Sequence, residues 1–552
     1  MRVRPLMFAA VVASVPLALF STGGATSEPG GGVIPQPQAS GPPVITPAVR
    51  HDTSRPLREM PTPAPVAREP RQVPLHVPPN LAERHKGFAK RPDPVAQPDF
   101  GLSLTPVPSL VVEGQSDDEN AEFAGGRVVP PDTNGDVGPD HYVQFINLIL
   151  SVYDKSGNRT FGPVPGNAIW EGFGGICETN NDGDPIVMHD HLANRWVVSQ
   201  FAIGTDGHQC VAVSATGDPA GAYHRYDFVV SPGAFNDYPK LGVWPDAYYL
   251  SANEFDGGFR GAIAVALERD RMLNGLSARM VKFGPLGCGT ECFFSILPAD
   301  LDGGAPPSGT PNTFVMSFDD ETWGSGQNPD GYRLWDFAVN WAVPANSSFT
   351  ALPQVNAAEF DANLCRFSAC VPQPAGELLD TLSQFTMYRG AFRRLGRIDT
   401  LVVSHTVDAT GSNLAGVRWA ELRKISGTWT LAQQGTIAPG DGHHRWMGSA
   451  AMDEDGNIAI GYSVASRNLF PAIRYAVHQA GVDALGSVGA EESLHEGTGS
   501  QRASFNRWGD YSSMSVDPRD GCTFWYTQEY YANTERFDFK TKIGSFKVPS
   551  CR

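Results

Sequence analysis

Several common signatures are missing from this 552-residue sequence. It has no Gly-x-Ser-x-Gly, no His-Glu-x-x-His and no Gly-x-x-x-x-Gly-Lys segment. These absences disfavour a serine-hydrolase elbow, a zinc protease of the zincin type and nucleotide-dependent chemistry. The sequence also lacks long stretches with apolar residues at helical spacing, so short strands have to form most of the fold.

Long apolar runs are equally scarce, and the longest lies at the N-terminus. Residues 1–26 have a basic start, an apolar stretch of about 15 residues and a small-residue end, which is typical of a secretory signal peptide. Because a membrane-spanning helix needs roughly 20 apolar residues, we expect no membrane span. The sequence therefore predicts a secreted, extracellular protein, and we expect a monomer.

Residues 27–110 are crowded with proline and show neither helical nor strand periodicity. Such composition is typical of an extended, mostly disordered segment. We predict a leader or linker here, either a pro-segment or a spacer that holds the domain off a surface. The domain itself is predicted over residues 111–552.

Cysteine is sparse but even in number, with eight residues. In an exported chain such cysteines are expected to be oxidised, and the spacings do not fit a zinc site. Free buried thiols are the alternative. Clustering along the chain suggests four pairs, which are Cys177 with Cys210, Cys288 with Cys292, Cys365 with Cys370, and Cys522 with Cys551.

The chain is acidic, with a formal charge of −17, and its first 108 residues are slightly basic, so the remainder is more acidic still. Nucleic acid is therefore an unfavourable partner. Divalent cations and neutral or basic substrates are easier to accommodate.

The fold is predicted from an internal repeat. An apolar piece, a turn with Asp and an aromatic or β-branched strand recur, with turns near residues 140, 190, 246, 312, 399, 453 and 517. The spacing fits one four-stranded blade plus variable loops. We predict an all-β fold, a β-propeller of seven four-stranded blades. Six or eight blades and a parallel β-helix remain alternatives, because the fourth and fifth copies are degenerate.

Two segments resemble the Asp-box turn of sialidase-type propellers, residues 153–161 and 214–223, although Thr216 stands where the motif has Asp. Together with residues 237–246 and 507–514, they make the chain similar to secreted bacterial sialidase-like (Asp-box or BNR-type) propeller proteins. The resemblance implies fold and export and brings no settled activity. Sialidases use three arginines and a Tyr/Glu pair; Arg389, Arg445, Arg507, Tyr511 and Glu529 are available, but no motif fixes their roles.

Polar residues precede several copies of the repeat, where the innermost strand of each blade begins near the axis. We therefore expect them to face one central cavity. Asp184, Asp237 and Asp510 are candidates for the paired carboxylates of glycoside hydrolysis. In a lyase, His443 or His444 would be the base, Arg445 or Arg507 would neutralise a uronate, and Tyr511 would donate the proton. The predicted catalytic set is Asp184, Asp237, Tyr238, His443, Arg445, Arg507, Asp510 and Tyr511.

The segment Asp132-Thr-Asn134-Gly-Asp136-Val-Gly-Pro-Asp140 has oxygen-bearing side chains at alternate positions, like the first half of a calcium loop. It lacks the closing acid. We therefore expect Ca²⁺ at Asp132, Asn134, Asp136 and Asp140, with turn capping by the same residues as the alternative.

Nearby aromatic residues, among them Trp244, Trp323, Trp446 and Trp508, suit sugar stacking on a rim or packing between blades. The sequence thus predicts a carbohydrate-active propeller, a glycosidase or polysaccharide lyase acting on a polysaccharide or glycoconjugate. The alternative is a non-catalytic propeller that binds glycan or protein at the cell surface. Fold analogy underlies both hypotheses.

Overall fold

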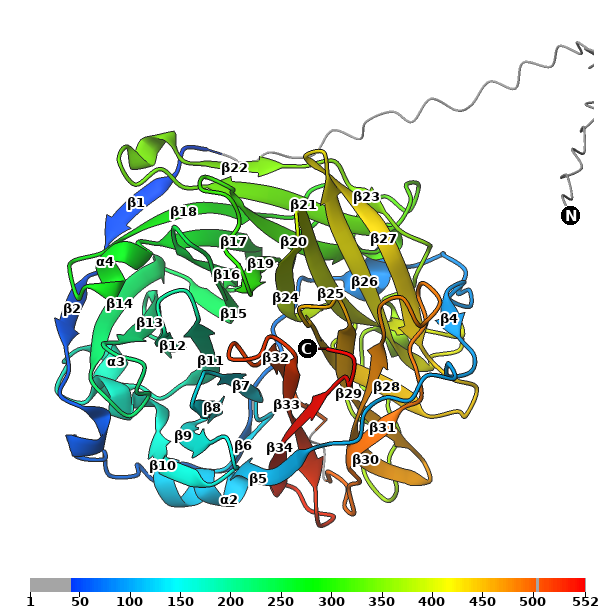
Figure 1. The fold of residues 1–552 in the computed structure, drawn as a ribbon, viewed down its shortest axis with the longest axis horizontal. Helices are drawn as coiled ribbons and strands as arrows, with labels where there is room; N and C mark the ends of the chain where they lie inside the picture. Colours follow the sequence, from blue (N-terminus) through cyan, green and yellow to red (C-terminus); the bar gives the residue numbers. More distant parts are fainter. Residues whose placement is uncertain (1–40, 503–505, 552) are drawn as a thin grey trace, which may run out of the picture. The chain divides into compact units, whose positions relative to one another are not determined.

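The computed structural model describes residues 41–502 and 506–551. The predicted signal peptide lies outside these residues. The described part of the chain is built mostly of antiparallel sheets, with their strands arranged around a central axis (Figure 1). This arrangement is typical of β-propellers and confirms the all-β prediction.

Within each sheet, consecutive strands pair with one another. The first two sheets contain β7 (Asn134–Val137), β8 (His141–Ile146), β9 (Ile149–Asp154) and β10 (Arg159–Pro165), then β11 (Gly183–Asp190), β12 (Arg195–Ile203), β13 (Gly207–Ser214) and β14 (Tyr223–Ser231). The third contains β15 (Phe235–Val243), β16 (Tyr248–Phe255), β17 (Phe259–Leu267) and β18 (Arg279–Leu286).

The next sheet has ten strands, because β19 and β24 pair in parallel and join two groups. One group contains β19 (Leu297–Asp302), β20 (Asn312–Phe318), β21 (Gly331–Ala338), β22 (Ser348–Ala351) and β23 (Val355–Asn356). The other contains β24 (Thr386–Leu395), β25 (Ile398–Asp408), β26 (Ala415–Ile425), β27 (Thr428–Ile437) and, as the tenth strand, β4 (Ala96–Gln97). The last two sheets contain β28 (His444–Met452), β29 (Ile458–Ser466), β30 (Leu469–His478) and β31 (Glu492–His495), then β32 (Ser513–Val516), β33 (Thr523–Tyr531) and β34 (Phe539–Lys547).

Helices are few and short in the described residues. They are α1 (Leu81–Arg84), α2 (Asp117–Glu119), α3 (Ile176–Thr179), α4 (Arg269–Leu273) and α5 (Asp320–Trp323), with some single helical turns. None of the described helices is long and apolar enough to cross a membrane. The scarcity of helix agrees with the missing helical periodicity of the sequence.

Residues 41–110 differ from the disordered segment expected there. Four short strands form in this leader, and each pairs with a strand of the domain: β1 (Val44–Pro47) with β18, β2 (Arg50–Thr53) with β14, β3 (Arg71–Gln72) with β6 (Val128–Val129), and β4 (Ala96–Gln97) with β27. At the boundary between leader and domain, β5 (Leu110–Ser116) pairs with β34. Exposed strand edges offer unpaired N–H and C=O groups, which even a proline-rich segment can satisfy. Composition alone did not reveal these partners.

Aromatic side chains fill the space between neighbouring sheets. Tyr475 of β30 stacks on Phe546 of β34 with ring centres 3.9 Å apart, and Tyr142 of β8 stacks on Trp525 of β33 at 5.2 Å. Each large apolar side chain buried in this way contributes about 1.5–3 kcal/mol relative to exposure. The four predicted tryptophans, Trp244, Trp323, Trp446 and Trp508, are all buried, so they pack between strands and form no exposed rim.

All eight cysteines are paired, in the four combinations that their clustering suggested. Four disulfides are typical of proteins from oxidising, extracytoplasmic environments. The two segments that resemble Asp-box turns join the third and fourth strands of their sheets, β9 to β10 and β13 to β14.

Candidate functional site

Residues near the starts of the innermost strands have an unusual backbone conformation. Positive φ angles between 48° and 61° occur at Asp132 and Asp510, just before β7 and β32, and at Asp184 and Tyr238, within the first four residues of β11 and β15. For residues other than glycine this left-handed conformation costs on the order of 1–3 kcal/mol. Such strain persists only where surrounding contacts hold it, and it often marks functional positions.

Several of the predicted residues come together at this end of the axis. The backbone N–H of Tyr238 donates to Asp184 at 3.1 Å, and the Tyr238 hydroxyl donates to the backbone carbonyl of Asp510 at 3.3 Å. Arg507 forms ion pairs with Asp510 and, at 3.1 Å, with Asp380. We call the following residues the axial cluster: Asp132, Asp184, Asp237, Tyr238, Lys240, Asp380, Arg507, Asp510 and Tyr511.

Lys240 lies at the centre of the axial cluster. Its ammonium nitrogen is 3.5 Å from the ring centre of Tyr238 and 3.8 Å from that of Tyr511, which are cation–π distances. The side chain is fully buried, and burial lowers its pKa to about 8. Neighbouring carboxylates, Asp184 first, act in the opposite direction.

The carboxyl groups of the axial cluster outnumber its two cationic groups. Burial raises the pKa of Asp184 to about 6 and that of Asp380 to about 8, with the charge of Asp510 adding to both effects. Burial and the charge of Asp184 raise the pKa of Asp237 well above its usual range. Near neutral pH, protonated and ionised carboxyls therefore lie side by side.

Two carboxyl oxygens in the axial cluster lack a hydrogen-bond partner among the described residues, Asp132 Oδ1 and Asp510 Oδ1, although both side chains are buried. A buried oxygen without a partner costs about 1–3 kcal/mol. These two atoms can therefore accept hydrogen bonds from a ligand.

Lys240 and Asp380 were not predicted from the sequence. Lys240 follows Tyr238-Pro239 on a buried inner strand, and a lysine in an otherwise apolar strand was the available signal. Asp380 lies in the long connection before β24, where no motif points to it. Asp132, predicted as a metal ligand, belongs to the axial cluster instead.

Two predicted catalytic residues lie elsewhere. Arg445 is held by Asp441 and Glu491, each at 2.8 Å, and the backbone N–H of His443 donates to Asp441. Arg445 and the His443 backbone therefore bind these acidic residues, and the lyase arrangement stays a prediction. Arg389 pairs with Asp300 and Asp302, so the three arginines named for a sialidase site have separate partners.

The four predicted calcium ligands also have separate partners. Asn134 accepts a hydrogen bond from Val187 N–H, and Asp136 accepts one from His189 N–H, each at 2.7 Å. Asp140 is exposed and pairs with Arg519. Asn134 and Asp136 thus lock β7 to β11, as the capping alternative proposed, and calcium binding at this segment stays a prediction.

Part of the leader lies against the axial cluster. The side-chain oxygen of Gln72 accepts hydrogen bonds from the N–H groups of Asn506 and Arg507, and the carbonyl of Val73 accepts one from the Arg507 guanidinium at 2.8 Å. We call residues 71–79 the strap. Its residues Leu75, His76, Val77 and Pro79 line a groove of about 520 Å³, together with Phe235, Phe255 and Phe259.

The groove and the axial cluster are linked through β15. Phe235 begins β15, and Asp237, two residues later on the same strand, is partly exposed. Side chains two residues apart on a strand point to the same face. The groove therefore combines aromatic surface with access toward a carboxyl group.

Comparisons with known proteins identify no family. No family model matches the chain, and no curated protein matches it, so membership of the sialidase-like group stays a prediction. Similar solved structures include a PL25 ulvan lyase bound to a GlcA-Rha3S oligosaccharide (10% identity, TM-score 0.35, covering 83% of this chain and 95% of that chain). A GH43 endo-arabinanase from Bacillus licheniformis (11%, 0.27, 56% and 96%) and a Synechocystis apocarotenoid oxygenase mutant (11%, 0.29, 65% and 73%) also match. Similarity this distant carries no argument about activity.

Proposed function

We propose that this protein is a secreted carbohydrate-active propeller that hydrolyses glycosidic bonds, with the axial cluster as its catalytic centre. The proposal rests on one observation: carboxyl groups that differ in protonation lie close together in the axial cluster. Asp237 is partly exposed with a raised pKa, which suits a general acid. Burial raises the pKa of Asp510, but its ion pair with Arg507 opposes that rise and favours the ionised form, which suits a base or nucleophile.

Hydrolysis is favoured over elimination by the positions of the basic residues. A lyase needs a free base and a cation that neutralises the uronate. Arg445 is occupied by Asp441 and Glu491, and Arg507 already binds Asp380, Asp510 and the strap carbonyl of Val73, so neither guanidinium is free to neutralise a uronate. Hydrolysis by the carboxyl groups of Asp237 and Asp510 is therefore the reaction that these residues support best.

The groove beside the strap supplies a route for the substrate. Its phenylalanine rings offer flat apolar faces of the kind that stack on sugar rings. We propose that a glycan lies along Phe235 and Phe255 and reaches Asp237 from there. The substrate class is a polysaccharide or glycoconjugate.

Three finer assignments accompany this proposal. We count seven blades, because the ten-stranded sheet divides between β19 and β24. We retain export by the predicted signal peptide, supported by the four disulfides. The resemblance to sialidase-like propellers is retained for the fold.

A non-catalytic glycan-binding propeller is the second candidate. The strap favours it, because residues 71–73 cover Arg507 and restrict access to the axial cluster. In that case the groove would bind glycan and the carboxyl groups would only hold the inner strands together.

The experiment is a screen of the purified secreted chain on neutral, acidic and sialylated glycans. New reducing ends without absorbance from unsaturated uronates support hydrolysis. Unsaturated uronate products would contradict hydrolysis and would indicate a lyase. Glycan retention without any product would favour the binding protein.

A further inference from the structure

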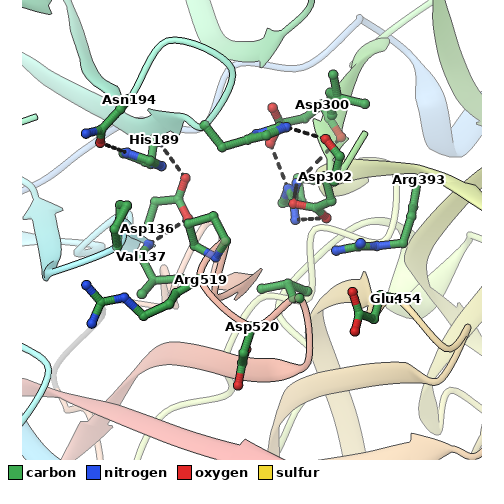
Figure 2. A pocket seen from close by; sticks show the side chains of 18 residues that line it. Asp136, Val137, His189, Asn194, Asp300, Asp302, Arg393, Glu454, Arg519 and Asp520 are labelled. Atoms are coloured by element: carbon green, nitrogen blue, oxygen red, sulfur yellow. Dashed lines mark hydrogen bonds and ion pairs between the residues drawn. The ribbon is translucent and has the colours of Figure 1, made fainter. Parts of the chain in front are cut away.

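A second polar pocket lies at the opposite ends of the innermost strands. It has a volume of about 530 Å³ and is lined by residues that end β7, β11, β19 and β32 and by the loops that follow them, with residues of β24 (Figure 2). The axial cluster contributes none of these residues. The charged side chains lining this pocket are Asp136, Asp300, Asp302, Arg389, Arg393, Glu454, Arg519 and Asp520.

Most of these charges already have partners. Arg389 binds Asp300 and Asp302 at 2.8 Å each. Arg519 pairs with the exposed Asp140. Asp520 accepts hydrogen bonds from the turn that follows it and pairs with Lys547. Asp300, Asp302 and Asp520 thus have cationic partners, whereas Asp136 and Glu454 have no ion pair among the described residues.

Among the arginines of the pocket, Arg393 is the exception. It is 6% exposed, and its hydrogen bonds within the described residues consist of one from Nε to the carbonyl of Met452, at 2.7 Å. Its Nη atoms have no partner there, and the guanidinium points into the pocket (Figure 2). A guanidinium has five donors in a planar fork that matches a carboxylate, and the Nη donors of Arg393 are open to a ligand in the pocket.

We propose that this pocket binds a uronate residue of an acidic glycan, with the sugar carboxylate held by the Nη atoms of Arg393. The sugar hydroxyls donate to acceptors already in the pocket, Asp136, Asp302 and Glu454. A pocket of this volume holds one or two sugar residues. The carboxylate of the sugar would occupy the Nη donors of Arg393. Its hydroxyl groups would donate to the acidic side chains, which is why carboxyl groups can line a binding site for an anionic sugar.

This inference is independent of the proposed catalytic centre, because the two sites share no residue. The test is calorimetric titration of the full chain with D-glucuronate, D-glucose and acetate. Glucose is the matched neutral sugar, and acetate is the carboxylate without hydroxyls. We expect glucuronate to bind at least tenfold more tightly than either. Equal binding of glucose or acetate, or no heat from glucuronate, would overturn the proposal.

Substitutions then assign the binding to Arg393. We expect Arg393→Gln to abolish glucuronate binding and Arg393→Lys, which keeps the charge but loses the fork, to weaken it about tenfold. Arg394→Gln is the control, because Arg394 is the next residue of β24 and binds Asp399 outside the pocket. Unchanged binding in Arg393→Lys would contradict the bidentate contact even if Arg393→Gln failed to fold. Retained binding in Asp237→Asn would separate this site from the axial cluster.

Discussion

The ammonium nitrogen of Lys240 lies 3.8 Å from the ring centre of Tyr511, although Lys240 belongs to β15 and Tyr511 lies just before β32, far away in sequence. Lys240 is the cation around which the carboxyl groups Asp132, Asp184, Asp237 and Asp510 gather. Because Lys240 is buried, removing its charge from water costs free energy, and removing it from the cluster would leave the carboxylates without a counter-charge in a low-dielectric environment.

Replacing Lys240 with Met tests this role. The variant retains side-chain length but leaves ionised carboxyls without their counter-charge. We expect a loss of about 3 kcal/mol in unfolding free energy at pH 7, where Lys240 is charged and Asp184 is ionised, and a smaller loss at pH 5, where more of the carboxyls are protonated. Urea unfolding at both pH values measures it. Lys547→Met, at a more exposed ion pair, is the control and should change stability little. Equal losses at both pH values would contradict the role of Lys240.

The stability of the whole domain should depend on pH. Burial raises the pKa of Asp184 to about 6, Asp136 to about 7 and Asp380 to about 8. The folded chain therefore binds these protons more tightly than the unfolded chain, so their stabilisation is complete below about pH 4 and is lost as the pH rises from 4 to 8. Burial lowers the pKa of His189 and His444 to about 4, so their contribution is lost as the pH falls from about 6.5 to 4.

The three carboxyl groups outweigh the two histidines, so together these groups place the maximum of stability near pH 4 and lower it toward pH 8. Urea unfolding at pH 4, 5.5 and 8 would measure the curve, and we expect the unfolding free energy at pH 8 to be a few kcal/mol below the maximum. Greater stability at pH 8 than at pH 5.5 would show that the carboxyls are not protonated in the folded chain.

The pairing of the leader with the domain should contribute to stability. Asp52 of β2 binds the buried guanidinium of Arg225 through two contacts of 2.7 and 2.6 Å. We expect Asp52→Ala to cost about 2–3 kcal/mol, because it leaves a buried charge unpaired. The matched control is Asp218→Ala, which breaks an exposed pair with Arg58 and should cost under about 1 kcal/mol. Thermal unfolding that is unchanged in Asp52→Ala would contradict the docking of β2.

The strap is predicted to depend on Gln72. Its side-chain oxygen accepts two backbone N–H groups, from Asn506 and Arg507. We expect Gln72→Ala to raise hydrogen exchange across residues 71–79 about tenfold or more, since a lost contact of about 1.4 kcal/mol changes local opening by a factor of ten. Gln97→Ala is the control, because Gln97 binds Val488 and should loosen β4 only. Unchanged exchange in the strap would show that other contacts hold it.

The sequence predicted those features that repeat or are local. Turn residues with alternating strands indicated the sheets, and close spacing along the chain indicated the disulfide pairs. Asp184, Asp237 and Asp510 were placed at one end of the axis because each lies at or near the start of an innermost strand.

Features that depend on distant partners were not predictable. His443 and Arg445 also precede or begin an inner strand, but Asp441 and Glu491 draw them away from the axis. The leader has the composition of a disordered segment, yet strand edges of the domain give it order. Lys240 belongs to no sequence motif, and only the folded structure shows that it contacts the rings of Tyr238 and Tyr511.

The most direct test of the catalytic claim is the rate of reducing-end release by Asp237→Asn compared with Asp140→Asn, on the best glycan from the screen. Both variants remove one carboxyl charge, but Asp140 is exposed and remote from the axial cluster. We predict that Asp237→Asn lowers the rate at least a hundredfold, in keeping with the loss of a general acid, while Asp140→Asn retains it. Equal activity in the two variants would contradict a catalytic role for the axial cluster.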